Sequence, residues 1–176
     1  SVYGSINGSV SEKKKPNPQS KYALTKFQGE KIIKKYSKKY SYRYALLRYF
    51  NVVGASKSGK IGEIETSHNH LFKNIAISSL KKKPVINIFG NSYNTEDGTC
   101  IRDYIHVVDL ADIHIKSLKR LNLSKKSIIL NCGYGKGISV LQVAKKFEKI
   151  IKKKLILILI IVDLEMWPKY TPIHQS

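Results

Sequence analysis

The sequence predicts an α/β fold in which helices pack against a parallel sheet. Short apolar runs of strand length alternate along the 176-residue chain with longer amphipathic stretches of helical length. This alternation is typical of parallel sheets that are covered by helices. The chain is also 42% hydrophobic, which is enough to build the core of one domain.

The expected elements follow from these runs in chain order. Residues 1–4 end a strand, a long helix follows, and a second strand leads into the loop-rich segment 53–84. Strands and helices then alternate to about residue 160. The expected helices are 18–40, 71–80, 107–121 and 138–153, and the further strands are 43–52, 85–89, 127–132 and 155–162.

The helix over 18–40 contains the stretch "YALTK". Tyr22 and Lys26 are four residues apart, about one helical turn, so both side chains point the same way. A lysine ammonium beside a phenol favours the phenolate, and a tyrosine tuned in this way can act as a general base. The ordinary alternative is an exposed tyrosine and lysine that happen to lie one turn apart.

The strand over 43–52 lies in "YALLRYFNVVGA", an apolar run that closes at a glycine turn at Gly54. Arg48 and Asn51 are polar residues inside this run. In the simplest interpretation they are a strand-end charge and a turn residue. Alternatively, Asn51 lies at the carboxyl end of a parallel strand, where open α/β sheets bind ligands.

The segment after the strand at 85–89 is a polar loop that ends in "CIRDYIHV", which leads into the helix over 107–121. Asp109 is placed to cap or charge the first turn of that helix. Arg102 lies where the loop meets regular structure, and its planar guanidinium suits a phosphate group. The alternative for Arg102 is a structural ion pair with Asp97 or Asp103.

Together, several stretches of the chain resemble the UDP-glucose 4-epimerases, which are extended members of the short-chain dehydrogenase/reductase family. The resemblance runs from residue 1 to about residue 150. Tyr-x-x-x-Lys marks only the superfamily, whereas "NTEDGTCIRDYIHV" is similar to the 4-epimerase branch. The matching stretches are "SVYG" (1–4), "YALTK" (22–26), "LRYFNVVGA" (47–55), "GKIGE" (59–63), "IFGNSYNTEDGTCIRDYIHVVDLAD" (88–112) and "NCGYGKGISVLQV" (131–143).

The resemblance implies a partial Rossmann-type parallel sheet with helices, plus a smaller substrate-binding lobe. Residues 1–55 would be the C-terminal part of the NAD-binding domain, 56–154 mainly the UDP-sugar-binding lobe, and 155–176 a divergent tail. The family carries a glycine-rich phosphate loop on its first strand. This sequence contains neither G-x-x-G-x-x-G nor G-x-G-x-x-G. We therefore expect a fragment of a longer protein that is inactive by itself.

The resemblance also assigns roles to individual residues. Tyr22 would be the catalytic base, and Lys26 would be its partner and hold the nicotinamide ribose. Tyr49 would lie beside the nicotinamide. As ordinary alternatives, Phe89 belongs to the core and His70 to a surface loop. The implied substrate residues are Asn51 and Arg102 for the diphosphate, Phe89 near the uracil, and His70, Leu71 and Tyr104 in the same pocket, with the 68–71 segment along its wall.

The implied activity is interconversion of UDP-glucose and UDP-galactose in galactose metabolism. Bound NAD would oxidise the sugar transiently at C4, and the full-length form would be a homodimer without a metal site. One alternative is another NAD-dependent sugar-nucleotide epimerase or dehydratase. Dehydratases usually carry an acidic pair just before "VYG", and Ser1 at the second of those positions argues against them. The other alternative is a basic, non-catalytic binding protein that retains part of the fold.

The formal charge of +20 is the main argument for a nucleic-acid partner. Nearly all of the basic residues are lysines in short, scattered runs, whereas specific nucleic-acid sites favour arginine and aromatic stacking. We therefore expect no specific nucleic-acid function. The longest apolar run, 155–162, is far shorter than the roughly 20 residues that cross a bilayer. With no signal peptide visible, we expect no membrane partner and a cytoplasmic protein.

Overall fold

The computed structural model describes residues 2–4, 6, 8–64 and 70–160. Strands and helices alternate along the described chain, and the predicted α/β class is confirmed. The elements are α1 (Lys21–Tyr40), β1 (Ala45–Tyr49), β2 (Asn51–Val53), α2 (Leu71–Ser79), β3 (Val85–Phe89), β4 (Ile101–His106), α3 (Val107–Ser124), β5 (Ile128–Cys132), β6 (Gly137–Ser139), α4 (Val140–Ile151) and β7 (Ile156–Ile160).

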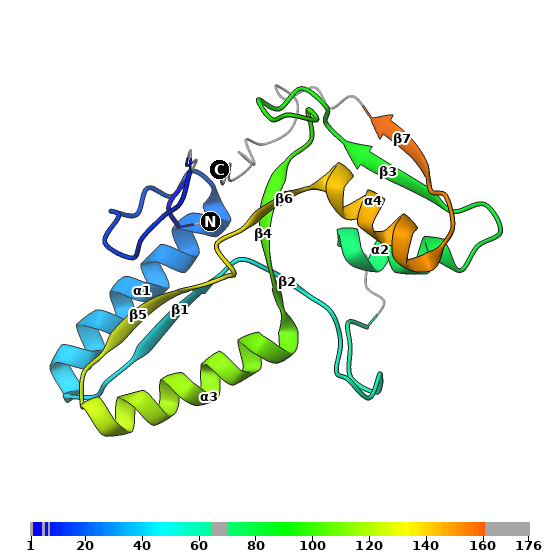
Figure 1. Cartoon of the computed structure of the whole chain (residues 1–176). Helices are drawn as coiled ribbons and strands as arrows, with labels where there is room; N and C mark the ends of the chain where they lie inside the picture. The colour runs from blue at the N-terminus through cyan, green and yellow to red at the C-terminus, as the bar shows by residue number, and fades with distance from the viewer. Residues whose placement is uncertain (1, 5, 7, 65–69, 161–176) are drawn as a thin grey trace.

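The elements form two groups with a set of short strands between them (Figure 1). We call α1, β1, β5 and α3 the first lobe, and α2, β3, α4 and β7 the second lobe. Strands β2, β4 and β6 lie between the lobes and form a three-stranded sheet in the order β2–β4–β6. The pairs β1–β5, β2–β4 and β3–β7 are parallel, and β4–β6 is antiparallel. Within the described residues, the expected parallel sheet is therefore divided into three small sheets.

Helix α1 begins at Lys21, within one helical turn of the start that the sequence predicts, and it ends at Tyr40 as predicted. The side chain of Ser20 caps it by accepting a hydrogen bond from the backbone N–H of Ala23 at 3.1 Å. The helix ends where Ser41 adopts a left-handed conformation with φ of 54°. Most of its side chains are exposed, and its buried residues are Ala23 and Glu30. A buried glutamate on such a helix requires a partner.

The partner of Glu30 is Arg48 on β1. Nε of Arg48 donates to Oε1 of Glu30 at 2.8 Å, and Nη2 donates to Oε2 at 2.6 Å. The third guanidinium nitrogen, Nη1, donates to the hydroxyl of Tyr3 at 2.6 Å, and that hydroxyl donates to Oδ1 of Asn131 on β5 at 2.7 Å. Arg48 is thus more than a strand-end charge, because it joins α1, β1, β5 and the amino-terminal segment.

The expected strand over 43–52 is two strands, and the chain changes partners at Phe50. Strand β1 pairs with β5, whereas β2 pairs with β4. The backbone N–H of Phe50 still donates to the carbonyl of Cys132 at 3.2 Å. The predicted glycine turn follows at Gly54, whose φ is 91°. A Cβ at this position would overlap the ring of His106.

The regular structure differs from the prediction at three further places. Residues 101–106 form strand β4 and not merely a lead-in to a helix, and the short strand β6 precedes α4. Strand β4 was not predicted because it contains the polar residues Arg102 and Asp103, whereas a central strand is expected to be continuously apolar. Val2 and Tyr3 lie in a turn and not at a strand end. There the carbonyl of Val2 accepts from the N–H of Asn17 at 2.9 Å.

Strand β4 supplies successive residues to two separate cores. Tyr104 packs into the core of the second lobe with Ile75, Ile86 and Ile88. Ile105, the next residue, packs into the core of the first lobe. Successive side chains of a strand point to opposite faces, so β4 forms the wall that both lobes share. The core of the first lobe consists of Ile105, Leu110 and Cys132, with Leu47, Ile113 and Leu130 packed against them.

The core of the second lobe predicts a specific stability effect. Ile75 on α2 is 0% exposed. Ile75→Ala should lower the free energy of unfolding by about 2–5 kcal/mol, because it removes buried methylene groups and leaves a cavity. Leu80→Ala, at the 86% exposed residue that ends the same helix, should change it by less than about 0.5 kcal/mol. Urea denaturation of both variants would test this, and equal effects would contradict the packing described.

Candidate active site

Tyr22 and Lys26 lie on the first two turns of α1, as the sequence predicts. The Nζ atom of Lys26 is 5.1 Å from the centroid of the Tyr22 ring, and the Tyr22 side chain is 56% exposed. The ammonium group therefore lies against the phenol, and the phenol faces outward. This arrangement leaves the hydroxyl of Tyr22 accessible to a bound molecule.

Tyr49 and Asn51 lie at the carboxyl end of β1. Tyr49 is the last residue of β1 and is 54% exposed. Asn51 begins β2 and is the register partner of Tyr104 on β4. The placement of Asn51 just beyond the carboxyl end of a parallel strand agrees with the ligand-binding position that the sequence suggests.

Arg102 is the second residue of β4, and both carboxylates that could pair with it have other partners. Asp103 accepts from the backbone N–H groups of Tyr134 at 3.1 Å and Gly135 at 2.9 Å. Asp97 accepts from the backbone N–H of Thr99 at 2.9 Å and from its hydroxyl at 2.6 Å. Among the described residues, Arg102 forms no ion pair with a carboxylate. The interpretation of Arg102 as a structural ion pair is therefore wrong for these two partners.

Asp97 also fixes the loop before β4 to the start of α4. Its carboxylate accepts a hydrogen bond from the hydroxyl of Ser139, the residue that caps α4. Burial alone would raise the pKa of the Asp97 carboxyl, but the hydrogen bonds from Ser139 and Thr99 outweigh it and hold that pKa below its usual range. The carboxylate is therefore ionised at neutral pH, and the loop that leads to Arg102 is held at a defined position.

Tyr104 and Phe89 lie in different environments. The ring of Tyr104 packs against Phe72 on α2, with 5.0 Å between the ring centroids. Burial raises the pKa of Tyr104 to about 12, so its hydroxyl is protonated at neutral pH. Phe89 ends β3 and is 49% exposed. The interpretation of Phe89 as a core residue is wrong, because the alternate residues Ile86 and Ile88 form the buried face of β3.

His70 and Leu71 lie at the start of α2. The side chain of His70 is exposed, and its Nδ1 is 2.6 Å from Oε1 of Glu63. Leu71 is half-buried and packs against the core of the second lobe. The other two residues of the expected 68–71 segment lie outside the described residues.

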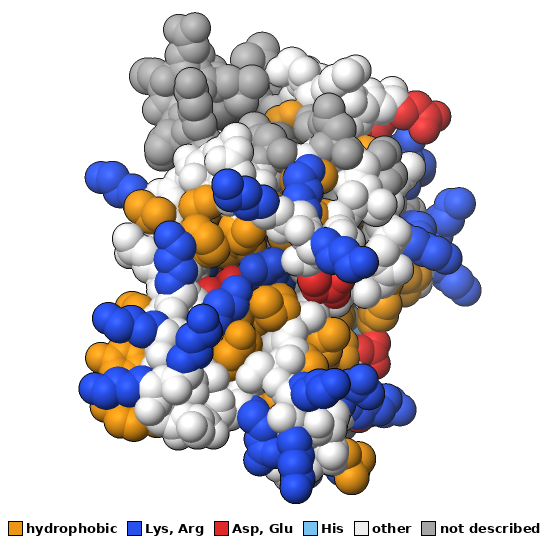
Figure 2. All heavy atoms as spheres, turned by 90° about the vertical axis from the view of Figure 1, so that its left-hand side faces the viewer, with side chains coloured by type: hydrophobic (Ala, Val, Ile, Leu, Met, Phe, Trp, Pro, Cys, Tyr) orange, Lys and Arg blue, Asp and Glu red, His pale blue; other side chains and the backbone are white. Residues whose placement is uncertain are grey.

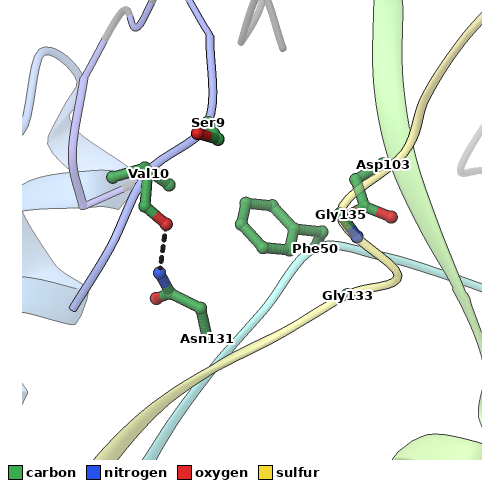
Figure 3. Close-up of a pocket in the computed structure, with 7 residues that line it drawn as sticks. All are labelled: Ser9, Val10, Phe50, Asp103, Asn131, Gly133 and Gly135. Atoms are coloured by element: carbon green, nitrogen blue, oxygen red, sulfur yellow. Dashed lines mark hydrogen bonds between the residues drawn. The ribbon is translucent and has the colours of Figure 1, made fainter. Parts of the chain in front are cut away.

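A cavity of about 200 Å³ lies between the amino-terminal segment and the middle strands (Figure 3). The ring of Phe50 points toward Val10 and Asn131, Asp103 lies on its other side near Gly135, and the side-chain nitrogen of Asn131 donates to the carbonyl of Val10 at 2.9 Å. At Gly133 the backbone runs so close that a Cβ would overlap Oδ2 of Asp103 and lie 2.6 Å from Cδ2 of Phe50. The cavity is lined by Ser9, Val10, Phe50, Asp103, Asn131, Gly133 and Gly135.

Sequence reasoning missed Glu30 and Asp103 as residues that hold the site in place. Glu30 follows Lys26 by four residues, so the one-turn spacing that identifies Tyr22 and Lys26 continues to it. This spacing is the signal that identifies Glu30. Asp103 carries no such signal, because its partners are backbone groups about thirty residues further along the chain.

Lysine side chains are scattered over the molecular surface. Figure 2 shows the face on the left of Figure 1, where blue side chains alternate with apolar and uncharged ones. None of the helices in the described part of the chain has the length and apolar character that crossing a membrane requires. Within the same residues, no cluster of His, Cys, Asp or Glu side chains could hold a metal ion.

Comparison with known protein families assigns the chain to one of them. Residues 1–133 match the model of the NAD dependent epimerase/dehydratase family. The match covers well over half of the chain, and the chain belongs to this family.

Two of the individual proteins similar to this chain are named UDP-glucose 4-epimerases. The chain is 41% identical over 133 residues to a UDP-glucose 4-epimerase of Azospirillum brasilense, covering 76% of this chain and 38% of that protein. It is 43% identical over 164 residues to UDP-glucose 4-epimerase 2 of Oryza sativa, covering 90% of this chain and 40% of that protein. The chain thus spans about two fifths of the length of the curated relatives it matches.

Solved structures of similar proteins confirm the Rossmann-type α/β fold. One is a UDP-glucose 4-epimerase from Stenotrophomonas maltophila with bound NAD and formylated UDP-arabinopyranose, with a TM-score of 0.84 and 34% identity. Another, from Bifidobacterium longum in complex with NAD+ and UDP, has a TM-score of 0.82 and 32% identity. Each comparison covers 90% of this chain and 48% of the other.

The close approach at Gly133 predicts opposite effects for two glycine substitutions. Gly133→Ala should lower the free energy of unfolding by about 1–3 kcal/mol, because the new methyl group must displace Phe50 or Asp103. Gly29→Ala is a matched control, because Gly29 lies within α1 and a Cβ there has no atom within 4 Å. It should stabilise the protein by up to about 1 kcal/mol through helix propensity. Chemical denaturation would measure both changes, and a neutral Gly133→Ala would contradict the close approach.

Proposed function

We propose that this chain contributes the base and part of the substrate site of a UDP-glucose 4-epimerase, which interconverts UDP-glucose and UDP-galactose. The observation that carries the proposal is the placement of the Lys26 ammonium against the outward-facing phenol of Tyr22. The relatives named UDP-glucose 4-epimerase support the choice of substrate.

In this proposal Tyr22 acts on the hydroxyl at C4 of the sugar. The phenolate oxygen takes the hydroxyl proton as C4 becomes a ketone, and it returns a proton when C4 is reduced on its other face. Lys26 stabilises the phenolate through its positive charge. One tyrosine therefore serves both directions, because the same proton moves out and back.

NAD supplies the hydride acceptor and donor at C4 when it is bound. The residues present fit its nicotinamide end. Lys26 offers a donor for ribose hydroxyl groups, and Tyr49 offers a half-exposed aromatic ring at the carboxyl end of β1. This end of a parallel strand is where α/β sheets bind nucleotides.

The second group of residues would hold the UDP part of the substrate. Arg102, with no carboxylate partner among the described residues, would bind the diphosphate together with Asn51, which borders Tyr104 in the β2–β4 pair. The exposed ring of Phe89 would lie near the uracil. His70, Leu71 and Tyr104 would line the pocket. Since the Tyr104 hydroxyl is protonated, it can only donate to a substrate anion.

A full-length hybrid provides the direct test. Residues 1–133 of this chain would replace the matching segment of the Azospirillum brasilense relative. Circular dichroism would establish that the hybrid folds. The hybrid should convert UDP-galactose to UDP-glucose in the presence of NAD, and a folded hybrid without this activity would contradict the proposal.

The role of Tyr22 predicts a loss of turnover. In the hybrid, Tyr22→Phe should lower kcat by about 10²–10⁴-fold, the usual contribution of a general base. The KM for UDP-galactose should change little, because the hydroxyl contacts the reacting sugar oxygen and not the UDP. Tyr36→Phe, at another exposed tyrosine of α1, is the control. Retention of more than about a tenth of kcat by Tyr22→Phe, well outside that range, would show that another group is the base.

The role of Arg102 predicts a loss of substrate affinity. Arg102→Ala should raise the KM for UDP-galactose about tenfold or more, because charged hydrogen bonds to phosphate contribute about 1.5–3 kcal/mol. A triple variant, Lys81→Ala with Lys82→Ala and Lys83→Ala, removes three exposed charges before β3 and should not do so. Steady-state kinetics would separate the two cases. Equal increases in KM for both variants would mean that general basicity holds the nucleotide.

A further inference from the structure

A buried charged pair lies on the same helix as the proposed base. Glu30 and Arg48 have side chains that are 9% and 8% exposed, and two parallel hydrogen bonds join them. These hydrogen bonds hold the pKa of Arg48 above its ordinary value, against the effect of burial. The guanidinium of Arg48 is therefore charged, and its salt bridge with Glu30 lies in the interior of the first lobe.

Glu30 continues the stripe of α1 that begins with Tyr22 and Lys26. The three residues follow at intervals of four, so each lies about 6 Å further along the helix and about 40° further around it, and the row turns from the exposed Tyr22 and Lys26 to the buried Glu30. At the other end of the ion pair, Arg48 is the residue immediately before Tyr49. The pair therefore joins the helix that carries the base to the strand that carries the proposed cofactor residue.

The strand side of the ion pair is held rigidly. The third nitrogen of the Arg48 guanidinium donates to Tyr3, and the hydroxyl of Tyr3 donates to Asn131 on β5. Arg48 is also the register partner of Asn131 in the parallel β1–β5 pair, and its guanidinium carbon lies 4.8 Å from the centroid of the Tyr3 ring. All three nitrogens are engaged, so the guanidinium plane has a single orientation.

A buried ion pair is a poor means of adding stability, because removing two charges from water offsets much of their attraction. A bidentate pair does provide geometry, since two parallel bonds fix the carboxylate in the plane of the guanidinium. A rotation or a shift of α1 along its axis would break both bonds at once. Apolar contacts along the same face would tolerate such a shift.

We propose that Glu30 and Arg48 form a positioning pair, which fixes the rotation and the axial position of α1 so that Tyr22 and Lys26 face the end of β1 at Tyr49. The proposal rests on the proposed function for its catalytic consequence. Its structural content, that this pair holds α1 on β1, does not depend on that function and can be measured separately.

The catalytic test uses the full-length hybrid. Glu30→Gln keeps the shape of the side chain and removes its charge, and Arg48→Lys keeps the charge and removes the planar fork. Each should lower kcat about 10–100-fold, because a displacement of about 1 Å at a reacting group can cost 10²-fold in rate. The KM for UDP-galactose should stay within about threefold of the parent, because α1 is not among the elements proposed to hold the diphosphate and uracil. The double variant should be no worse than the more damaging single variant, since both remove the same contact.

Asp112→Asn is the matched control. It removes one carboxylate from an exposed pair, in which Asp112 and Lys116 are 2.6 Å apart on α3. Its kcat and KM should equal those of the parent hybrid. A rise in KM without a fall in kcat for Glu30→Gln and Arg48→Lys would overturn the positioning role, and so would a fall in kcat no larger than that of Asp112→Asn.

The structural test uses the 176-residue chain itself and does not require epimerase activity. Amide hydrogen exchange should show that Glu30→Gln loses protection in α1 and β1, while β3 and α4 of the second lobe keep theirs. A uniform loss across the chain would indicate general destabilisation, and no loss would indicate that the pair does not hold the helix. Either result overturns the inference. An inactive parent hybrid combined with a localised loss would instead refute the proposed function and retain the positioning pair.

Discussion

The charge of Arg48 lies inside the first lobe, and the arrangement of that lobe depends on its being paired. A buried guanidinium must satisfy its donors, because an unpaired ion in the interior is very costly. Its partners come from residues that are far apart in sequence: Glu30 on α1 and Tyr3 in the amino-terminal segment, with Asn131 on β5 bonded to Tyr3. Satisfying one side chain therefore fixes the amino-terminal segment, the helix and two strands relative to one another.

Asp103 connects segments that are far apart in sequence, as Arg48 does, but it lies between the two lobes. Its carboxylate accepts from two backbone N–H groups of the loop after β5, and it lies on the strand that supplies Tyr104 to one core and Ile105 to the other. Because Asp103 and Asp97 are both engaged elsewhere, Arg102 has no carboxylate partner among the described residues, although acidic residues surround it in sequence. The hydrogen bonds that stabilise this region thus engage both neighbouring carboxylates with groups other than Arg102, to which we assign the diphosphate in the proposed function.

Local patterns in the sequence predicted the helices and the outer strands, because these follow from periodicity and end residues that lie within a few positions of one another. The pairing of Tyr22 with Lys26 was predictable for the same reason. Strand β4 was missed because its polar residues are satisfied by distant groups, which a local window cannot show. The change of partner at Phe50 was missed for a related reason, because the apolar run continues through it without interruption.

The proposed roles in proton transfer and in substrate binding fall on different elements of the chain. Proton transfer would depend on α1 and the end of β1, whereas substrate affinity would depend on β2, β3, β4 and α2. The two sets meet where β2 pairs with β4, at the register pair Asn51 and Tyr104. Asn51, a proposed diphosphate residue, is two residues from Tyr49, the proposed cofactor residue, so the two sets are adjacent along the chain. A substitution on α1 can therefore affect turnover while affinity is retained, whereas a change at the β2–β4 pair should disturb both, because it moves the two sets relative to each other.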